Sequence, residues 1–551
     1  MTAEKIRRWV AAHPNWTLAL ITCAVLGPFL GKPFNVDDPL FIWAAQHIQQ
    51  HPANPYSFTV EWGWTRFPMW KVTENPPLVC YYLALTGALF GWSEWALHSA
   101  LLAPAVAVVL GTRRLAGHFC GRPVFAALLA LFMPVFLISA NTVMCDIAML
   151  AFWVWAIVLW IEGLEAGSIN KLAMSGVLMA LAEMTKYYGA CLIPLLAAYA
   201  VARQLPVRKW GQCLIIPAGV LCLYQYGTAA MYGESLLYRA MDYATYYQGQ
   251  AGASRMQNGV CGLMFAGGCL TTVVFFAPHF WRQRGALFVA AAMLAGILLL
   301  LLSPLWKSHD NRPWIQAQMI LWSMGGMMVL TLALLNVWRR RDAGSILLML
   351  WVGGTFVFAA FCNWSVNGRS ILPMTPAAAI LIVQWLEKNS RVMTNAVRLS
   401  FLASVLFAVM ALCGDFSRAV AVRESVDEVA EKYASRGATL WYEGHWGFQF
   451  YMDQAKAKPM DFKQGGYRPG DYVVVPANNT NLFPPDARRA SLADVFTVAV
   501  PGWMTTFSPG LGASFYSSLL GPLPLAIGPA DPEIVKVYYL NPPSGQVAPG
   551  R

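Results

Sequence analysis

The stretch NWTLALITCAVLGPFLG, residues 15–31, and its continuation KPFNVDDPLFIWAAQHI, residues 32–48, together predict the class of fold. The first part contains no charged residue, which is typical of a helix that crosses a bilayer. The second part begins at Lys32 and brings two adjacent acids, Asp37 and Asp38, shortly after the apolar run. We therefore expect a membrane-spanning helix that carries an acidic pair to one surface of the membrane.

The rest of the chain has the same character. Of its 551 residues, 57% are hydrophobic and 12% are charged, whereas a soluble domain has about 25% charged residues. The apolar residues fall in long runs, which predicts a polytopic α-helical membrane protein. The net charge of +11 comes from short basic clusters between those runs. Such clusters set membrane orientation, so we expect no nucleic-acid partner.

The N-terminus predicts how the chain enters the membrane, and the cysteines predict whether disulfides support its hydrophilic part. Lys5, Arg7 and Arg8 precede the first apolar run, and no small-residue cleavage site follows before Pro33. We interpret the run as a span with a cytoplasmic N-terminus and not as a cleaved signal peptide. All 11 cysteines lie at or before Cys413, without a CxxC pair, so no disulfide framework supports the hydrophilic C-terminal region.

The apolar runs and basic clusters predict the topology. The run at 77–91 is short, and we place it at the outer interface, because a span there would send Arg113 and Arg114 outside. About 13 spans remain, at roughly 15–31, 95–111, 123–140, 147–161, 172–185, 187–202, 212–232, 259–280, 286–305, 314–337, 345–362, 370–386 and 399–414. The cytoplasmic clusters are then Arg113, Arg114 and Arg122; Arg203, Arg208 and Lys209; Arg282 and Arg284; Arg339, Arg340 and Arg341; and Lys388, Arg391 and Arg398. This topology describes a multi-pass protein of the cytoplasmic (inner) membrane.

The odd number of spans predicts two parts that meet outside the cytoplasm. We divide the chain into a transmembrane module, residues 1–414, whose first outer loop is about 32–94, and a periplasmic domain, residues 415–551. In the domain, TLWYEG and DYVVVP are typical of short buried strands, and GFQFYMDQA between them is typical of a helix. A small α/β domain with an irregular Pro/Gly-rich tail is expected. Its aromatic segment WYEGHWGFQFYM favours a hydrophobic core, with acceptor docking as the alternative.

Five charged residues fall at the outer ends of predicted spans. Charges at membrane depth cost free energy unless they are paired or hydrated, so such residues are functional candidates. They are Asp37, Asp38, Asp146, Lys186 and Arg369. Each has a structural alternative. The aspartates could cap helices, Asp38 most clearly because Pro39 follows it; Lys186 could extend to the interface, and Arg369 could be an ordinary loop arginine.

Two kinds of chemistry use carboxylates and cations at an outer membrane face. In glycosyl transfer from a lipid-phosphate sugar, a carboxylate deprotonates the acceptor hydroxyl, and lysine or arginine neutralises the phosphate of the departing lipid. In an ion-coupled transporter or lipid flippase, acids relay protons, but they commonly lie mid-span at broken helices within a repeated fold. Here the acids lie at outer turns and no repeat is visible. The pattern favours a glycosyltransferase, with the transporter as the alternative.

Four segments, taken in order, resemble a known family. They are NPPLVCYYLALTGALFGWSEWALHSALLAP, SANTVMCDIAMLAFWVWA, LAEMTKYYGACLIPLL and NGRSILPMTPAAAILI. With the acidic pair before them, they resemble the GT-C glycosyltransferases of the branch that contains protein O-mannosyltransferases and the lipid A aminoarabinose transferase. The resemblance runs from about Asn35 to Leu386. It implies a dolichyl- or undecaprenyl-phosphate-linked sugar donor and a lipid, glycan or protein acceptor.

The resemblance also implies roles for single residues. Asp37 takes the position of the family's catalytic acid, Asp146 that of the acid in the second outer turn, and Lys186 that of the lysine near the lipid phosphate. Asp38 joins the catalytic set but replaces the usual Glu. Glu74 stands where the family often has His.

Three further residues complete the candidate site. Arg369 and Lys71 are candidates for contact with the donor phosphate. Tyr187, with Glu74, is a candidate for an acceptor or loop site.

The cofactor expectation follows from the same residues. Asp37, Asp38 and Asp146 could hold a divalent cation through oxygens, whereas Lys186 and Arg369 could supply the same positive charge without one. The related branches do not depend on a divalent cation for chemistry, so we assign no cofactor, with a divalent cation as the alternative. The Trp-Trp-Asp motif of oligosaccharyltransferases is absent from the C-terminal region.

Overall fold

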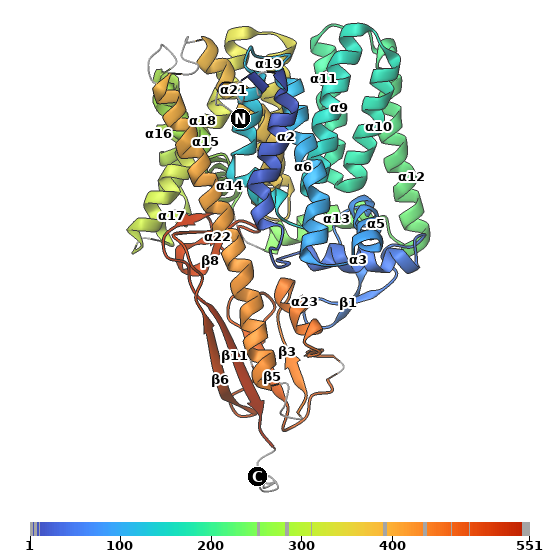
Figure 1. Ribbon diagram of the computed structural model, residues 1–551, viewed down its shortest axis with the longest axis vertical. Coiled ribbons are helices and arrows are strands. Elements are labelled where there is room, and N and C mark those ends of the chain that lie inside the picture. Colours follow the sequence, from blue (N-terminus) through green and yellow to red (C-terminus); the bar gives the residue numbers. More distant parts are fainter. Residues whose placement is uncertain are drawn as a thin grey trace.

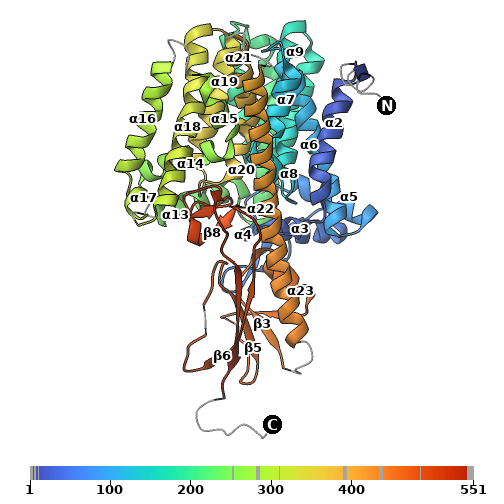
Figure 2. The same ribbon diagram turned by 60° about the vertical axis from the view of Figure 1, so that its left-hand side comes forward.

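The computed structural model describes residues 4, 8–9, 12–250, 254–280, 286–309, 311–388, 394–433, 438–463, 465–483 and 485–542. A helical bundle forms one end of the molecule and a smaller domain with strands forms the other (Figure 1). The N-terminal helix begins at the end of the bundle away from this domain (Figure 2). The predicted fold class, a helical membrane protein with a C-terminal α/β domain, is confirmed.

The bundle helices follow the predicted apolar runs. They are α2 (Pro14–Leu26), α6 (Glu94–Ala116), α7 (Pro123–Leu131), α8 (Pro134–Ala140), α9 (Asp146–Ala166), α10 (Ile169–Thr185), α11 (Leu192–Ala202), α12 (Ile215–Tyr232), α14 (Arg255–Cys269), α15 (Thr272–Phe276), α16 (Ala286–Leu302), α18 (Pro313–Arg340), α19 (Ala343–Val357), α21 (Thr375–Lys388) and α22 (Asn395–Tyr433). Among the described residues, seven helices are long and apolar enough to cross a membrane, or nine if two bent pairs each count as one span. The remaining predicted spans form shorter helices, so the count of 13 stays a prediction.

The bent pairs have a local cause in one case. Helices α7 and α8 meet at 66°, and Pro134 opens the second helix. Because proline lacks an amide hydrogen and clashes with the preceding turn, it breaks a helix at this position. The other pair, α14 and α15 with the turn that follows, bends by 71°.

Short helices line the end of the bundle that faces the domain (Figure 2). They are α3 (Asp38–Gln50), α4 (Met69–Val72), α5 (Leu78–Phe90), α13 (Leu236–Gln250), α17 (Pro304–Lys307) and α20 (Gly368–Ile371). Helix α5 is the run at 77–91, and its 13 residues are too few for a straight span. A two-stranded hairpin, β1 (Thr59–Glu61) with β2 (Arg66–Pro68), projects from the first loop toward the domain.

Three basic clusters lie at the end of the bundle away from the domain. Helix α6 begins at Glu94, whose carboxylate accepts from Tyr451 of the domain, and ends with Arg113 and Arg114. Helix α18 begins beside the domain, where Trp314 donates to the carbonyl of Ile527, and it ends with Arg339 and Arg340. Helix α21 ends with Lys388. The topology therefore separates these clusters from the domain. Lys5, Arg7, Arg282, Arg284 and Arg391 lie outside the described residues.

The C-terminal domain contains a five-stranded sheet of order β4-β3-β5-β11-β6. Strands β3 (Leu440–Tyr442) and β5 (Tyr472–Pro476) are the predicted ones, and α23 (Trp446–Gln454) is the predicted helix. The other strands are β4 (Lys458–Pro459), β6 (Ala490–Val498) and β11 (Glu533–Leu540), with the short β7 (Met504–Thr505), β8 (Phe507–Ser508), β9 (Ala513–Ser514) and β10 (Ala526–Ile527). The expectation of an irregular tail is wrong for β11, which pairs with both β5 and β6.

Helix α22 joins the two parts. It contains 39 residues, which at 1.5 Å per residue span about 59 Å, well beyond the ~30 Å of a bilayer's hydrocarbon core. The predicted division at 414/415 falls inside this helix and stays a prediction. One hydrophobic cluster runs from the bundle into the domain, where it includes Val474, Val535 and Val537.

Candidate functional site

Asp37 is held at the start of α3 by a strained backbone. The preceding Val36 has φ 46°, a left-handed conformation that costs a β-branched residue about 1–3 kcal/mol. Such strain persists only where surrounding contacts impose it, and it is common at functional sites. The turn fixes the direction in which the Asp37 carboxylate leaves the loop.

The carboxylate of Asp37 forms an ion pair with Arg369, whose Nη2 lies 2.9 Å from Oδ2. The side chain of Asp37 is 26% exposed and that of Arg369 is 11% exposed. Helix α20 presents this arginine, and Asn367 caps that helix by accepting from the Ser370 amide. The guanidinium also lies over the ring of Tyr516, 5.8 Å from its centroid, so the C-terminal domain contributes to the site.

A second ion pair joins Asp146 to Lys186, with 2.6 Å between Oδ1 and Nζ. Asp146 is the first residue of α9, and Lys186 occupies the extended break after α10. Arg369 interacts electrostatically with both Asp37 and Asp146. The structure therefore brings four of the predicted residues into one cluster. Oδ2 of Asp146 is buried and has no hydrogen-bond partner among the described residues.

Asp38 has a different environment from Asp37. It is fully buried, and its carboxylate accepts from the backbone amides of Asn35 and Val143, each at 2.8 Å. Burial raises the pKa of Asp38 to about 7, against the lowering effect of Lys32 and these amides. Its oxygens tie the first loop to the second outer turn. These contacts favour a positioning role for Asp38, and its predicted part in catalysis stays a prediction.

Glu74 and Tyr187 lie in a neighbouring polar group. Burial raises the pKa of Glu74 to about 8, partly offset by Arg239. Glu74 interacts electrostatically with Tyr187 and Tyr243, and Tyr243 also interacts with Asp37. The group thus adjoins the main cluster. Sequence reasoning missed Arg239 and Tyr243, although α13, which carries both, has an amphipathic pattern that indicates an interfacial helix.

Lys71 is directed elsewhere. Its ammonium lies 4.9 Å from the centroid of the Trp70 ring, and its carbonyl accepts from Arg239 at 2.8 Å. The structure gives no contact between Lys71 and either ion pair of the cluster. Its predicted role at the donor phosphate remains untested.

A cavity opens from Asp37 and Arg369 toward the C-terminal domain. Its lining includes Trp364 from the bundle, and Tyr516, Trp446 and Gly447 from the domain. Trp446 is also in the left-handed region, with φ 67°, and a Cβ on Gly447 would lie 2.0 Å from the carbonyl oxygen of Phe34. The backbone of α23 therefore approaches the first loop as closely as glycine allows. Most of the aromatic segment around it is core, as Trp441, Tyr442, Phe448, Phe450 and Tyr451 are buried.

Sequence reasoning missed two further ion pairs, both with buried side chains, and one of them, Arg418–Glu533, lines this cavity. Lys32 bonds to Asp415 at 2.5 Å and to the carbonyl of Asn141 at 2.9 Å, with both charged side chains fully buried. Asp415 also accepts from Thr506 and Tyr516. Lys32 follows the first apolar run and Asp415 ends the last one, so charges at membrane depth were a signal for this pair.

The second pair of this kind joins Arg418 to Glu533, which are also buried. Arg418 belongs to α22 and Glu533 to β11, so this pair ties the last span to the sheet. We call these two pairs the buried pairs. We call Asp37–Arg369, which lines the cavity, and Asp146–Lys186, which adjoins it through the interaction of Asp146 with Arg369, the cavity pairs.

The aspartates are not arranged as a metal site in this structure. Among the described residues, no group of three or more His, Cys, Asp or Glu side chains could hold a metal ion. Asp37 and Asp146 each pair with a cation, and Asp38 binds backbone amides.

Residues 74–232 match the family described as dolichyl-phosphate-mannose-protein mannosyltransferase. The matched segment contains Glu74, Asp146, Lys186 and Tyr187. The resemblance to GT-C glycosyltransferases is thereby confirmed over this segment. No curated protein matches the chain.

A comparison with solved structures finds similar chains. The apo oligosaccharyltransferase of Archaeoglobus fulgidus is 13% identical, with a TM-score of 0.48 over 85% of this chain and 70% of that chain. ArnT from Cupriavidus metallidurans bound to undecaprenyl phosphate is 13% identical, with a TM-score of 0.41 over 85% of this chain and 92% of that chain. The Archaeoglobus fulgidus enzyme tethered with an acceptor peptide is 13% identical, with a TM-score of 0.45 over 83% of this chain. The match spans 65% of the length of that enzyme.

Proposed function

We propose that this chain, whose residues 74–232 match the mannosyltransferase family, is a membrane glycosyltransferase. It transfers a sugar from a polyprenyl-phosphate-linked donor to a lipid, glycan or protein acceptor at the outer face of the cytoplasmic membrane. The observation that carries the proposal is the cluster of two carboxylate–cation pairs beside a cavity, where the bundle meets the C-terminal domain.

Asp37 is the general base in this proposal. Its carboxylate lines the cavity and stays partly exposed, so an acceptor hydroxyl can approach its oxygens. A carboxylate in hydrogen-bond reach of that hydroxyl removes its proton as the new glycosidic bond forms. The strained Val36 and the buried Asp38 hold this carboxylate in place.

Lys186 and Arg369 receive the phosphate of the departing lipid. An ammonium has three N–H donors and a guanidinium has five, and the ion pairs use only some of them. Negative charge builds on the phosphate as the bond to the sugar breaks, so cations beside it stabilise the transition state. Asp146 holds Lys186 in place and keeps one carboxylate oxygen for a substrate hydroxyl.

A transporter or lipid flippase needs a different arrangement. Its acids would line a path through the middle of the spans, whereas the acids here lie at helix ends beside the domain. No observation on the described residues favours transport.

The test compares envelope glycans, glycolipids and glycoproteins, by mass spectrometry, in cells with the parent chain, without it, and with Asp37→Asn. We expect one sugar mass to disappear from the same acceptor in the last two, with membrane levels of the variant unchanged. Solute or lipid movement by the purified protein in liposomes, without a new glycosidic bond, would instead favour the transporter.

A further inference from the structure

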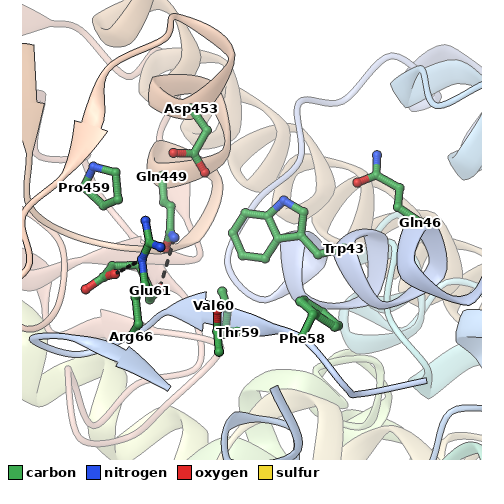
Figure 3. Close-up of a pocket in the computed structure, with 10 residues that line it drawn as sticks. All are labelled: Trp43, Gln46, Phe58, Thr59, Val60, Glu61, Arg66, Gln449, Asp453 and Pro459. Carbon is green, nitrogen blue, oxygen red and sulfur yellow. Dashed lines mark hydrogen bonds and ion pairs between the residues drawn. The ribbon is translucent and has the colours of Figure 1, made fainter. Parts of the chain in front are cut away.

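A second pocket lies between the first loop and the C-terminal domain, apart from the cavity at Asp37. Its volume is ≈ 470 Å³. Figure 3 shows its walls, which come from α3, the β1–β2 hairpin, α23 and β4. The residues that line it are Trp43, Gln46, Phe58, Thr59, Val60, Glu61, Arg66, Gln449, Asp453 and Pro459. None of these residues lines the cavity at Asp37.

Glu61 is a buried carboxylate that lacks a hydrogen-bond partner. Its side chain is 8% exposed, and neither oxygen makes a hydrogen bond among the described residues. Its ion-pair contact is with Nε of Arg66 at 3.4 Å (Figure 3), and the side chain of that arginine is largely exposed. A buried polar group without a hydrogen bond costs about 1–3 kcal/mol, so a ligand that bonds to Glu61 gains by relieving this cost.

The pocket is preformed because the hairpin is fixed to the domain. Gln449 donates to the carbonyl of Glu61 at 3.0 Å, and His445 accepts from the Gly63 amide at 3.0 Å. Thr65 donates to Asp461 at 3.0 Å. These bonds join residues far apart in the sequence, so a ligand meets walls that are already ordered, at a smaller cost in entropy.

The lining combines aromatic walls with planar polar groups. Trp43 and Phe58 offer ring faces, on which the C–H face of a sugar ring can stack. Glu61, Gln46 and Arg66 offer donors and acceptors for hydroxyl groups. A phosphate or carboxylate ligand would be repelled, because Glu61 and Asp453 face the pocket with a single cation, Arg66. Neutral hydroxylated ligands fit this combination.

We propose that this pocket binds a saccharide unit of the acceptor, with Trp43 as the stacking platform and Glu61 as a hydrogen-bonding anchor. That the bound saccharide belongs to the acceptor rests on the proposed function. That the pocket binds a saccharide does not depend on that function. Trp43 lies on α3, six residues after Asp37 and so about 9 Å along the helix axis. The unit held here is therefore distinct from the one that reacts at Asp37, and the acceptor is an oligosaccharide or carries one.

The test measures binding of free oligosaccharides to the full-length chain in lipid nanodiscs, by saturation-transfer NMR with neutral, aminated and acidic glycans. We expect neutral glycans to bind, and Trp43→Ala and Glu61→Gln each to weaken binding by at least about tenfold. Trp503→Ala and Glu424→Gln are the matched controls, since both residues are exposed and outside the pocket. Both should bind like the parent chain.

Three outcomes would overturn the saccharide site. They are binding of no glycan, equal binding by the pocket and control variants, and preference for a simple amine such as ethylammonium over every neutral glycan. The proposed function fails separately. A parent chain that transfers sugar but binds no glycan loses only the pocket proposal, whereas one that binds glycans at Trp43 but transfers nothing keeps the pocket and loses the glycosyltransferase.

Discussion

The cavity pairs and the buried pairs use the same chemistry in opposite ways. In the buried pairs, Lys32 and Asp415 are fully enclosed and bond to several protein groups besides each other. In the cavity pairs, Asp37 and Lys186 keep part of their surface exposed, and Asp146 keeps an oxygen without a hydrogen bond. An ion pair beside a cavity, with donors or acceptors that make no hydrogen bond, can exchange its partners for groups of a substrate. A pair enclosed by protein holds the bundle to the domain.

The largest difference should appear in activity. Asp37→Asn removes the proposed base and should lower transfer by roughly 10²–10⁴-fold, while thermal stability in detergent stays close to that of the parent chain. Transfer is measured with purified protein and an isotopically labelled lipid-linked donor. Near-parental transfer would remove Asp37 from the mechanism.

Stability should respond most to the buried pairs. Lys32→Met leaves Asp415 charged and enclosed, which should cost about 3–5 kcal/mol and appear as a large drop in melting temperature. The double variant Lys32→Met/Asp415→Leu should regain much of this loss, because no buried charge stays unpaired. A single variant as stable as the parent would show that the buried pair does not hold the two parts together.

Donor affinity should separate two lysines of the candidate site. Lys186→Ala should raise the KM for the donor by roughly 10–100-fold, the range expected for one hydrogen bond to a charged group, with a smaller change in kcat. Lys71→Ala is the matched variant, since its ammonium contacts Trp70, and we expect little effect. An equal rise in both variants would extend the phosphate site into the first loop.

The smallest effect concerns Glu74. Burial raises the pKa of its carboxyl group from 4.5 to about 8. The unfolded chain releases this proton near pH 4.5, while the folded chain holds it to about pH 8, so stability falls as pH rises through that window. Glu74→Gln stays neutral and should lose less melting temperature than the parent between about pH 5 and pH 8. Parallel melting curves across this range would contradict the raised pKa.

Much of the fold follows from the sequence, because long apolar runs have few alternatives to a helix in a membrane. The runs around α6, α9 and α21 predict those helices, and the basic residues at the ends of α6 and α21 predict that these two ends lie on the same side of the membrane. Strand β11 was missed although EIVKVYYL alternates between buried and more exposed residues. Its position after Pro/Gly-rich sequence favoured an irregular tail.

The site was predictable in its members but not in its pairing. Asp37, Asp146, Lys186 and Arg369 stand out as charges at span ends, and the structure brings them together. The partners depend on distant contacts: Arg369 is 332 residues from Asp37, and Asp415 is 383 residues from Lys32. The strained turn at Val36 and the approach of Tyr516 to Arg369 depend on tertiary packing, which no local pattern specifies.

The unbroken course of α22 limits how the molecule can open. A continuous α-helix bends little. Because α22 forms both the last span and part of the C-terminal domain, the span and the domain move together as one rigid body. Access to the cavity then depends on movement of its other walls, which are the first loop at Asp37 and the segment that carries Trp364 and Arg369. Distances between spin labels at the two ends of α22 should therefore stay constant when substrate binds, as should those from α22 to the β1–β2 hairpin, which is bonded to the domain. Distances from α22 to α20 should change.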